Sequence, residues 1–413
     1  MGSDCVGEEI KLQRVSRLAL YGTGFFSLSI QMMISLIIPL MALELDASPF
    51  MIGLAVSAAA VMPTVFSISA GALIDQLGSK RVLFFSALFM TFFSMIYPLL
   101  TSIWILIFLQ LIYGQVQALN WISSQTYLAK LGKKSGDTSH AATYSLAVNL
   151  GNFVGPLIVG LVWDLSGIWA SFTVIAVWSG LLWISSTLLP VEKDKAAFKE
   201  AFVNKSVLLP RWRDYKKAFA LLAIPAVVFV IYGTFLRLSS YAIKSSFYLV
   251  YLKQLDFPAT VIAILTSFMA VVGIFSPLCL RWLSRYFGEE RLLIISLIVS
   301  ILPFSLTPLF DQLWQFMVLA VFTGFSAGLT FPLLITTLAR AVSPKEQGLA
   351  VGLRSTANQF AAATVPIMFG IFAQQFGISL SFYIVGAVLL LPIFFIVPAI
   401  LARVKANERN LPQ

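Results

Sequence analysis

Charged side chains are scarce in this sequence. Only 11% of the 413 residues are Asp, Glu, Lys or Arg, whereas 59% are hydrophobic. A soluble globular domain carries about a quarter charged residues, so this chain has too few to cover a surface that faces water. The composition therefore excludes an ordinary soluble enzyme or binding domain and favours a protein embedded in lipid.

Residues that build covalent, metal or catalytic sites are also few. There are two cysteines, Cys5 and Cys279, and one histidine, His140. One cysteine lies in the N-terminal tail and the other inside an apolar run, so neither a disulfide nor a thiolate metal site is expected. No cluster of carboxylates with histidine, and no nucleophile with a neighbouring base, is apparent. We therefore expect no metal, no cofactor and no enzymatic reaction.

Apolar runs of about 20 residues recur along most of the chain, which is the length of a helix that crosses a bilayer. Lipid offers no partner to a free backbone N–H or C=O, and the alternating strands of a membrane barrel are not seen, so these runs are expected to be helices. The twelve predicted spans are residues 18–42, 51–74, 81–100, 103–128, 140–163, 169–190, 220–252, 258–283, 291–309, 313–338, 347–373 and 379–402. The expected fold is an all-helical membrane bundle.

Positive charge is unevenly divided between the two sides of these spans. With the N-terminus in the cytoplasm, nearly all of the 28 Lys and Arg fall in cytoplasmic tails and loops, and the opposite side keeps Lys253. The positive-inside rule thus predicts cytoplasmic N- and C-termini in an inner or plasma membrane. Because the net charge of +10 lies in juxtamembrane loops, we expect no nucleic-acid partner.

The two halves of the chain resemble each other at a fixed offset of 210 residues. Matching positions include Gly78 and Gly288, Pro98 and Pro308, Trp104 and Trp314, and Pro156 and Pro366. The longest polar connection separates six spans from six. We therefore predict two parallel six-helix repeats. The predicted division is a first bundle over residues 1–190, a cytoplasmic linker over 191–217 and a second bundle over 218–413.

A charge-rich turn, within the stretch GALIDQLGSKR, follows the second predicted span. Gly71 allows close helix approach, and Gly78 allows a positive φ angle in the turn. Asp75 ends a helix, where it can accept hydrogen bonds from a neighbouring helix N-terminus or pair with a cation. Lys80 and Arg81 are expected to anchor the turn to the inner leaflet.

This spacing resembles the loop motif of the major facilitator superfamily, G-x-L-x-D-x-x-G-x-[RK]-[RK]. The six-plus-six plan extends the resemblance over nearly the whole chain. The resemblance implies a transporter fold in which Asp75 latches the two halves together on the cytoplasmic side, although a simple helix cap is the alternative. In the second repeat, Arg285 stands at the position equivalent to Asp75. Only the loop of the first repeat is therefore expected to act as the latch. Arg354, in the eleventh span, is expected to snorkel to the interface or to serve as a partner of the latch.

A glycine motif in the fifth predicted span is similar to the antiporter motif of drug-efflux members of the same superfamily. Its residues are Gly151, Gly155, Pro156 and Gly160. Simple helix packing is the alternative explanation for these small residues. Another position departs from the family, because Gln110 stands where many members carry an arginine thought to assist proton transfer. The resemblance therefore leans toward export without supporting the usual proton route.

Two cations, Arg237 and Lys244, lie inside the seventh predicted span, and no acidic residue is expected at mid-membrane to pair with them. Seven residues apart, they share a helix face about 10 Å apart along the axis. A cation left in lipid costs at least roughly 2.5–3.5 kcal/mol, so both are expected to face a wet cavity or an anion. The predicted binding residues are Arg237, Lys244, Tyr241, Tyr248, Ser27, Gln31, Gln110, Tyr113, Gln117, Asn120 and Trp121. For each uncharged residue, an interhelical hydrogen bond is the alternative.

These features predict a monomeric secondary transporter that moves a small anionic organic solute by alternating access. The resemblance places the first, fourth, seventh and tenth spans around the central cavity. Glu44, at the outer mouth, and Lys244 are the candidates for coupling to protons during efflux. Multidrug efflux of neutral or lipophilic compounds and anion exchange or uptake are alternatives within transport. A transporter-like receptor or scaffold is the alternative from another class.

Overall fold

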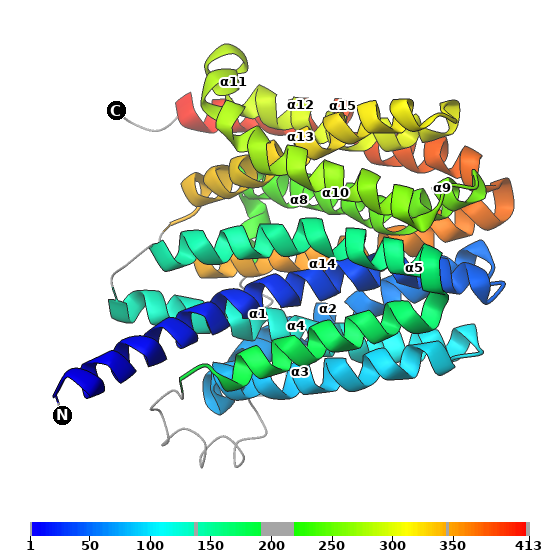
Figure 1. Cartoon of the computed structure of the whole chain (residues 1–413). Helices are drawn as coiled ribbons and strands as arrows, with labels where there is room; N and C mark the ends of the chain where they lie inside the picture. Colours follow the sequence, from blue (N-terminus) through cyan, green and yellow to red (C-terminus); the bar gives the residue numbers. More distant parts are fainter. Residues whose placement is uncertain (1, 136–138, 191–218, 344–346, 410–413) are drawn as a thin grey trace. The chain divides into compact units, whose positions relative to one another are not determined.

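The computed structural model describes residues 2–135, 139–190, 219–343 and 347–409. Within these ranges every regular element is a helix, as the cartoon in Figure 1 shows. The all-helical fold class predicted from the sequence is therefore confirmed. The predicted cytoplasmic linker, residues 191–217, lies outside the described residues.

The helices are long and follow one another through short turns. In the first half of the chain they are α1 (Gly2–Glu44), α2 (Pro49–Leu77), α3 (Ser79–Ile96), α4 (Ile103–Ser135) and α5 (Ser139–Thr187). In the second half they are α8 (Pro225–Ile243), the π-helix η4 (Lys244–Tyr248), α9 (Leu249–Gln254), α10 (Ala259–Phe275), α11 (Leu280–Phe287), α12 (Glu289–Ser305), α13 (Leu313–Ala341), α14 (Gln347–Phe376) and α15 (Ile378–Arg409). Short 3-10 turns accompany them at η1 (Tyr97–Leu99), η3 (Leu221–Ala223), η5 (Ser276–Cys279) and η6 (Thr307–Leu309).

Nine helical segments of the described residues are long and apolar enough to cross a membrane. One of them, His140–Thr187, contains the fifth predicted span and all but the last three residues of the sixth, because α5 continues through a kink at Gly167 (φ 73°, ψ −164°). The ninth predicted span lies in α12, which has 17 residues. The twelfth lies in α15, whose described apolar part is Ile378–Ile393. Each predicted span thus coincides with helix.

The backbone turns repeat at the offset found in the sequence. The described residues with positive φ are Gly78 and Gly288 (86° and 73°), Gly167 and Gly377 (73° and 80°), and Asp46 and Asp256 (51° and 61°). The numbers within each pair differ by 210. Because residues other than glycine seldom adopt positive φ, the same unusual conformation at paired positions marks equivalent tight turns.

Side-chain hydrogen bonds repeat at the same offset. After the kink in α5, the hydroxyl of Ser171 donates to the carbonyl oxygen of Gly167 at 3.0 Å. At the start of α15, the hydroxyl of Ser381 donates to the carbonyl oxygen of Gly377 at 2.7 Å. The two halves of the chain therefore share local structure as well as sequence landmarks.

The chain divides into two compact units. Unit 1 comprises Met1–Ile38, Val65–Pro210 and Pro258–Ala263, and unit 2 comprises Pro39–Thr64, Arg211–Phe257 and Ile264–Gln413. Each unit thus includes a stretch from the other half of the sequence: unit 1 takes the start of α10, and unit 2 takes the end of α1 and the start of α2. The division into bundles over residues 1–190 and 218–413 remains a prediction.

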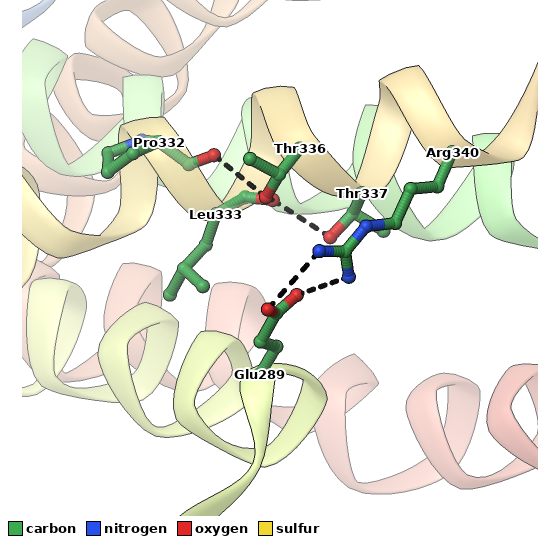
Figure 2. Close-up of polar contacts among 6 residues, drawn as sticks. All are labelled: Glu289, Pro332, Leu333, Thr336, Thr337 and Arg340. Atoms are coloured by element: carbon green, nitrogen blue, oxygen red, sulfur yellow. Dashed lines mark hydrogen bonds and ion pairs between the residues drawn. The ribbon is translucent and has the colours of Figure 1, made fainter. Parts of the chain in front are cut away.

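Within unit 1, α3 packs against α4 and α5; within unit 2, α8 packs against α12, α13 and α14. One end of the α12–α13 pair carries a bidentate ion pair, which Figure 2 shows. Nη1 of Arg340 lies 2.5 Å from Oε2 of Glu289, and Nη2 lies 3.3 Å from Oε1. Both side chains are exposed, so this pair contributes at most about 1 kcal/mol to stability.

Candidate functional site

The two predicted cations lie on consecutive helical segments of unit 2. α8 begins at Pro225, whose fixed φ angle suits the first helical position, and Arg237 lies in its second half. Lys244 is the first residue of the π-helix η4. A π-helical turn adds a residue to the helical repeat and is frequent at functional sites. The wider turn rotates the residues that follow Lys244 away from the face predicted for a regular helix.

The ring of Phe331, in α13, brings two arginines together. The guanidinium carbon of Arg237 lies 5.0 Å from the centroid of this ring, and that of Arg354, in α14, lies 5.5 Å from it. At these distances a cation is attracted to the face of an aromatic ring. The Nε atoms of both arginines are buried and have no hydrogen-bond partner. Arg354 therefore lies beside the predicted binding residue Arg237. The sequence did not predict that these two arginines would be neighbours.

Tyr241 lies near both predicted cations. Nζ of Lys244 is 5.7 Å from the centroid of the Tyr241 ring, and Tyr241 also interacts electrostatically with Arg237. Tyr248 packs edge-on against Phe304, with the ring centroids 5.2 Å apart, and its buried hydroxyl has no partner. The structure thus brings Arg237, Tyr241 and Lys244 together and places Tyr248 in an aromatic cluster.

Two predicted binding residues of unit 1 are hydrogen-bonded to each other. The hydroxyl of Ser27, in α1, donates to Oδ1 of Asn120, in α4, at 2.6 Å. Nδ2 of Asn120 donates to the hydroxyl of Ser86, in α3, at 3.3 Å. Ser27 and Asn120 are 2% and 0% exposed. Their arrangement is the interhelical hydrogen bond that is the alternative to substrate binding.

The second repeat contains an equivalent of this link. The hydroxyl of Thr330, in α13, donates to the hydroxyl of Ser296, in α12, at 3.1 Å. Subtracting 210 from these numbers gives Asn120 and Ser86. A polar connection between the third and fourth helices of each repeat is therefore part of the common framework.

The other predicted residues of α1 and α4 are less fully hydrogen-bonded. Gln110 and Tyr113 are buried, and neither Oε1 of Gln110 nor the hydroxyl of Tyr113 has a partner. Nε2 of Gln117 is also buried without a partner. Gln31 and Trp121 are half-buried. Buried polar atoms are normally hydrogen-bonded, so these groups are exceptions, and their role in binding a solute remains a prediction.

The glycine motif of α5 makes a close contact with α1. A Cβ atom at Gly151 would meet the backbone carbonyl of Phe25. A Cβ atom at Gly155 would lie 2.6 Å from the carbonyl oxygen of Ser29. Only glycine lets the two backbones approach this closely. The motif therefore acts in helix packing, and its role in antiport remains a prediction.

Gly160, also in α5, packs closely against the first turn of α10. Pro156 lies in α5 between Gly155, which contacts α1, and Gly160. A Cβ atom at Gly160 would lie 2.8 Å from the carbonyl oxygen of Ala259. The same contact recurs in unit 2, where a Cβ atom at Gly370 would lie 2.7 Å from the carbonyl oxygen of Pro49. Gly370 follows Gly160 by 210 residues, and Ala259 follows Pro49 by 210 residues, so the two contacts are equivalent in the two repeats.

The charge-rich turn connects α2 and α3. Gly78 precedes α3 and has the positive φ angle that its position predicts. Nζ of Lys80 donates to the carbonyl oxygens of Thr187, at 3.0 Å, and of Leu189. A cation is favourable at the carboxyl end of a helix, so Lys80 stabilises the end of α5.

The remaining predicted latch and proton-coupling groups are less defined. Gly71 and Asp75 belong to α2, but their surroundings lie outside the described residues. Arg81 is exposed in the first turn of α3. Glu44 is exposed at the end of α1 and interacts electrostatically with Lys253. Within the described ranges, no group of three or more His, Cys, Asp or Glu could hold a metal ion.

Phe331 is the residue of the site that sequence reasoning missed. The signal was present in the repeat, since adding 210 to the predicted binding residue Trp121 gives Phe331. The same addition carries Ser27 to Arg237. The aromatic residue and the cation of unit 2 thus occupy positions equivalent to two predicted binding residues of unit 1.

A sequence model of the Major Facilitator Superfamily matches residues 20–249 and, a second time, residues 236–413. The chain is also similar to the multi-drug resistance efflux pump PmrA from two strains of Streptococcus pneumoniae, serotype 4 (ATCC BAA-334 / TIGR4) and ATCC BAA-255 / R6. In each case it is 30% identical over 215 residues, which is 48% of this chain and 51% of the relative. The match thus spans about half the length of these relatives.

Solved transporter structures share the fold over nearly the whole chain. The nucleoside transporter NupG has a TM-score of 0.74 at 15% identity, and the match covers 93% of this chain and 98% of that one. A POT family transporter in complex with 5-aminolevulinic acid has a TM-score of 0.69 at 13% identity, and the match covers 93% of this chain and 96% of that one. At such low identity these structures establish the fold alone.

Proposed function

Because the chain belongs to the major facilitator superfamily, we propose that it is a secondary transporter that moves a small anionic organic solute across an inner or plasma membrane by alternating access. The observation that carries this proposal is the pair of cations Arg237 and Lys244. Neither has an acidic partner in the part of the chain that the structure describes. A cation within a membrane span is tolerated when negative charge or water compensates it, and an anionic solute supplies that charge.

Uncharged groups fit the organic body of such a solute. The unpartnered polar atoms of Gln110, Tyr113 and Gln117 can accept or donate hydrogen bonds, and the ring of Tyr241 offers an apolar face beside Lys244. The resemblance of the α5 glycine motif to an antiporter motif supports export. Lys244 and Glu44 are the proposed groups for coupling to protons. The distribution of Lys and Arg supports cytoplasmic N- and C-termini.

Ligand-induced thermal stabilisation of the purified full-length protein tests this function. The panel contains organic anions, neutral drugs and lipophilic cations. We expect anions to raise the unfolding midpoint, since a ligand that binds only the folded state stabilises it by mass action. The stabilisation should disappear in Arg237→Gln and Lys244→Gln but persist in Arg285→Gln, which removes an exposed arginine from α11 of the same unit. Anions that fail to stabilise the wild type would exclude the proposal.

Multidrug efflux of neutral or lipophilic compounds is the second candidate. The similarity to the efflux pump PmrA favours it. The same panel separates the two candidates, because buried cations repel cationic drugs and attract anions. Stabilisation by neutral or cationic compounds that survives in both Arg237→Gln and Lys244→Gln would favour multidrug efflux over anion transport.

A further inference from the structure

Three helices of unit 2 meet around the ring of Phe331, and two of them present an arginine to it. Arg237 comes from α8 and Arg354 from α14, with guanidinium carbons 5.0 Å and 5.5 Å from the ring centroid. The two cations are close enough to interact with each other electrostatically. Both arginines are half-buried and the ring of Phe331 is partly exposed. Like charges repel, and more strongly where water is partly excluded, so the fold holds these guanidiniums together against their mutual repulsion.

The aromatic ring offsets only part of this unfavourable energy. A cation–π contact contributes less free energy than it costs to place an arginine within a membrane span. Both Nε–H groups are also buried without a hydrogen-bond acceptor. Two positive charges and at least two unused donors therefore point to an acceptor that carries negative charge.

We propose that Arg237, Phe331 and Arg354 form the site that binds the acid group of the substrate, and that this group is dianionic, as in a phosphomonoester or a dicarboxylate. This inference rests on the proposed transport of an anionic solute and specifies where and in what charge state the anion binds. Guanidiniums bind such oxyanions through two parallel N–H···O hydrogen bonds. Two guanidiniums match two negative charges, and the ring of Phe331 provides an apolar wall.

Asn358 extends the site along α14. It follows Arg354 by four residues, so the two side chains lie on the same face of the helix. Oδ1 of Asn358 is buried and has no partner. An amide oxygen accepts hydrogen bonds but does not bind an anion, so the substrate should carry a hydroxyl or amine close to its acid group.

From the sequence alone, Arg237 and Lys244 were predicted to bind the anion together. In the structure, Lys244 lies over the ring of Tyr241, whereas Arg354 shares the ring of Phe331 with Arg237. The second cation of the acid site is therefore Arg354, and Lys244 is left for another part of the solute or for proton coupling.

Binding of phenyl phosphate to the purified full-length protein tests this site. The measurement is the unfolding midpoint as a function of ligand concentration at about pH 8, where a phosphomonoester with a second pKa near 6 is dianionic. Benzoate supplies one charge on a similar ring, and benzyl alcohol supplies none. We expect phenyl phosphate to bind more tightly than benzoate, and benzyl alcohol to give no shift. No shift with phenyl phosphate at millimolar concentration would overturn the site.

Substitutions assign the binding to the two arginines. Arg237→Gln and Arg354→Gln should each weaken phenyl phosphate binding at least about ten-fold, because truncating one member of a buried charge pair strongly reduces affinity. The double variant should bind little worse than either single variant, since the two residues act on one ligand group. Arg237→Lys and Arg354→Lys retain the charge without the planar fork and should give intermediate affinities. These lysine variants also keep the test valid if a glutamine variant does not fold.

The stability of the solute-free protein separates binding from a structural role. If the arginines serve binding, each glutamine variant should unfold at a higher midpoint than the wild type, because one of two repelling charges is gone. If they serve packing on Phe331, each variant should unfold at a lower midpoint, and that result would overturn the inference. Arg340→Gln is the control, since Arg340 lies in the same unit and pairs with Glu289 (Figure 2); it should leave phenyl phosphate binding unchanged.

The failure of this inference can be told apart from the failure of the proposed function. Phenyl phosphate binding that is lost in Arg237→Gln and Lys244→Gln but unchanged in Arg354→Gln would overturn the two-arginine site and keep anion transport. Stabilisation by lipophilic cations, without any by phenyl phosphate or benzoate, would overturn both.

Discussion

Asp164 caps the first turn of α10 through its contacts with Thr260. Oδ2 of Asp164 accepts a hydrogen bond from the backbone N–H of Thr260 and another from its hydroxyl, both at 2.6 Å. Oδ1 accepts a third, from the backbone N–H of Ala259, at 2.9 Å. A carboxylate satisfies free amides at a helix N-terminus and interacts favourably with the helix dipole. The contact therefore ties a turn from the second half of the sequence into unit 1.

This cap has no counterpart in the other repeat. The equivalent of Asp164 is Gln374, and the equivalent of Ala259 is Pro49, which begins α2. Proline has no backbone N–H to donate. The glycine contacts of the two repeats are therefore equivalent, whereas the carboxylate cap exists in the first repeat alone.

Replacing Asp164 by alanine should lower the stability of the protein by about 1 kcal/mol, the usual effect of losing a helix cap. Asp164→Asn should have a smaller effect, because its amide oxygen can still accept one hydrogen bond. Thermal unfolding in detergent measures both. Asp311→Ala is the control, since Asp311 is another exposed acid of the same chain. If Asp164→Ala matched this control, the cap would contribute nothing to stability.

A methyl group at Gly151 should be poorly tolerated. The added Cβ would meet the backbone carbonyl of Phe25, and a backbone cannot move aside as a flexible side chain does. We expect Gly151→Ala to destabilise the protein by about 1–3 kcal/mol, the usual range for overpacking. Gly180, also in α5, has open space around its Cβ position, so Gly180→Ala should be neutral or stabilising. Equal unfolding midpoints for the two variants would argue against the α1–α5 contact.

Asn120 and Gln117 should respond differently to alanine substitution, although both are predicted binding residues. Asn120→Ala removes hydrogen bonds to Ser27 and Ser86 and should lower the stability of the solute-free protein by about 1–3 kcal/mol. Gln117→Ala removes a side chain whose Nε2 has no partner, so it should change stability little and weaken solute binding. Unfolding with and without the best-binding anion of the panel separates these effects. If Gln117→Ala lowered stability strongly and Asn120→Ala did not, Gln117 would be the structural residue and Asn120 the binding residue.

The repeated framework could be predicted from the sequence because short-range chemistry determines it. Gly78 and Gly167 and their counterparts 210 residues later lie where a tight turn requires positive φ, and that requirement belongs to the residue itself. The twelve spans follow in the same way from the length of apolar runs. Gly151 and Gly155 were likewise recognised as small residues for close packing.

The partners across helices could not be predicted, because they depend on tertiary packing. Tyr248 was predicted as a binding residue, but the π-helix from Lys244 to Tyr248 changes the helical repeat after Lys244, and nothing in the local sequence announces it. Arg354 is far from Arg237 in the sequence, so its approach to Phe331 depends on how α8, α13 and α14 pack. The capping role of Asp164 is equally a matter of which helix lies beside it.

The role of Asp75 as a cytoplasmic latch is tested by removing its charge alone. Asp75→Asn keeps the size and shape of the side chain, so the unfolding midpoint should stay the same. An acid that holds a helix N-terminus or a cation acts through its negative charge, so we expect transport of the best-binding anion into proteoliposomes to fall. Glu290→Gln, which neutralises an acid in the first turn of α12, should transport normally. Undiminished transport by Asp75→Asn would leave this acid with no more than the role of a helix cap.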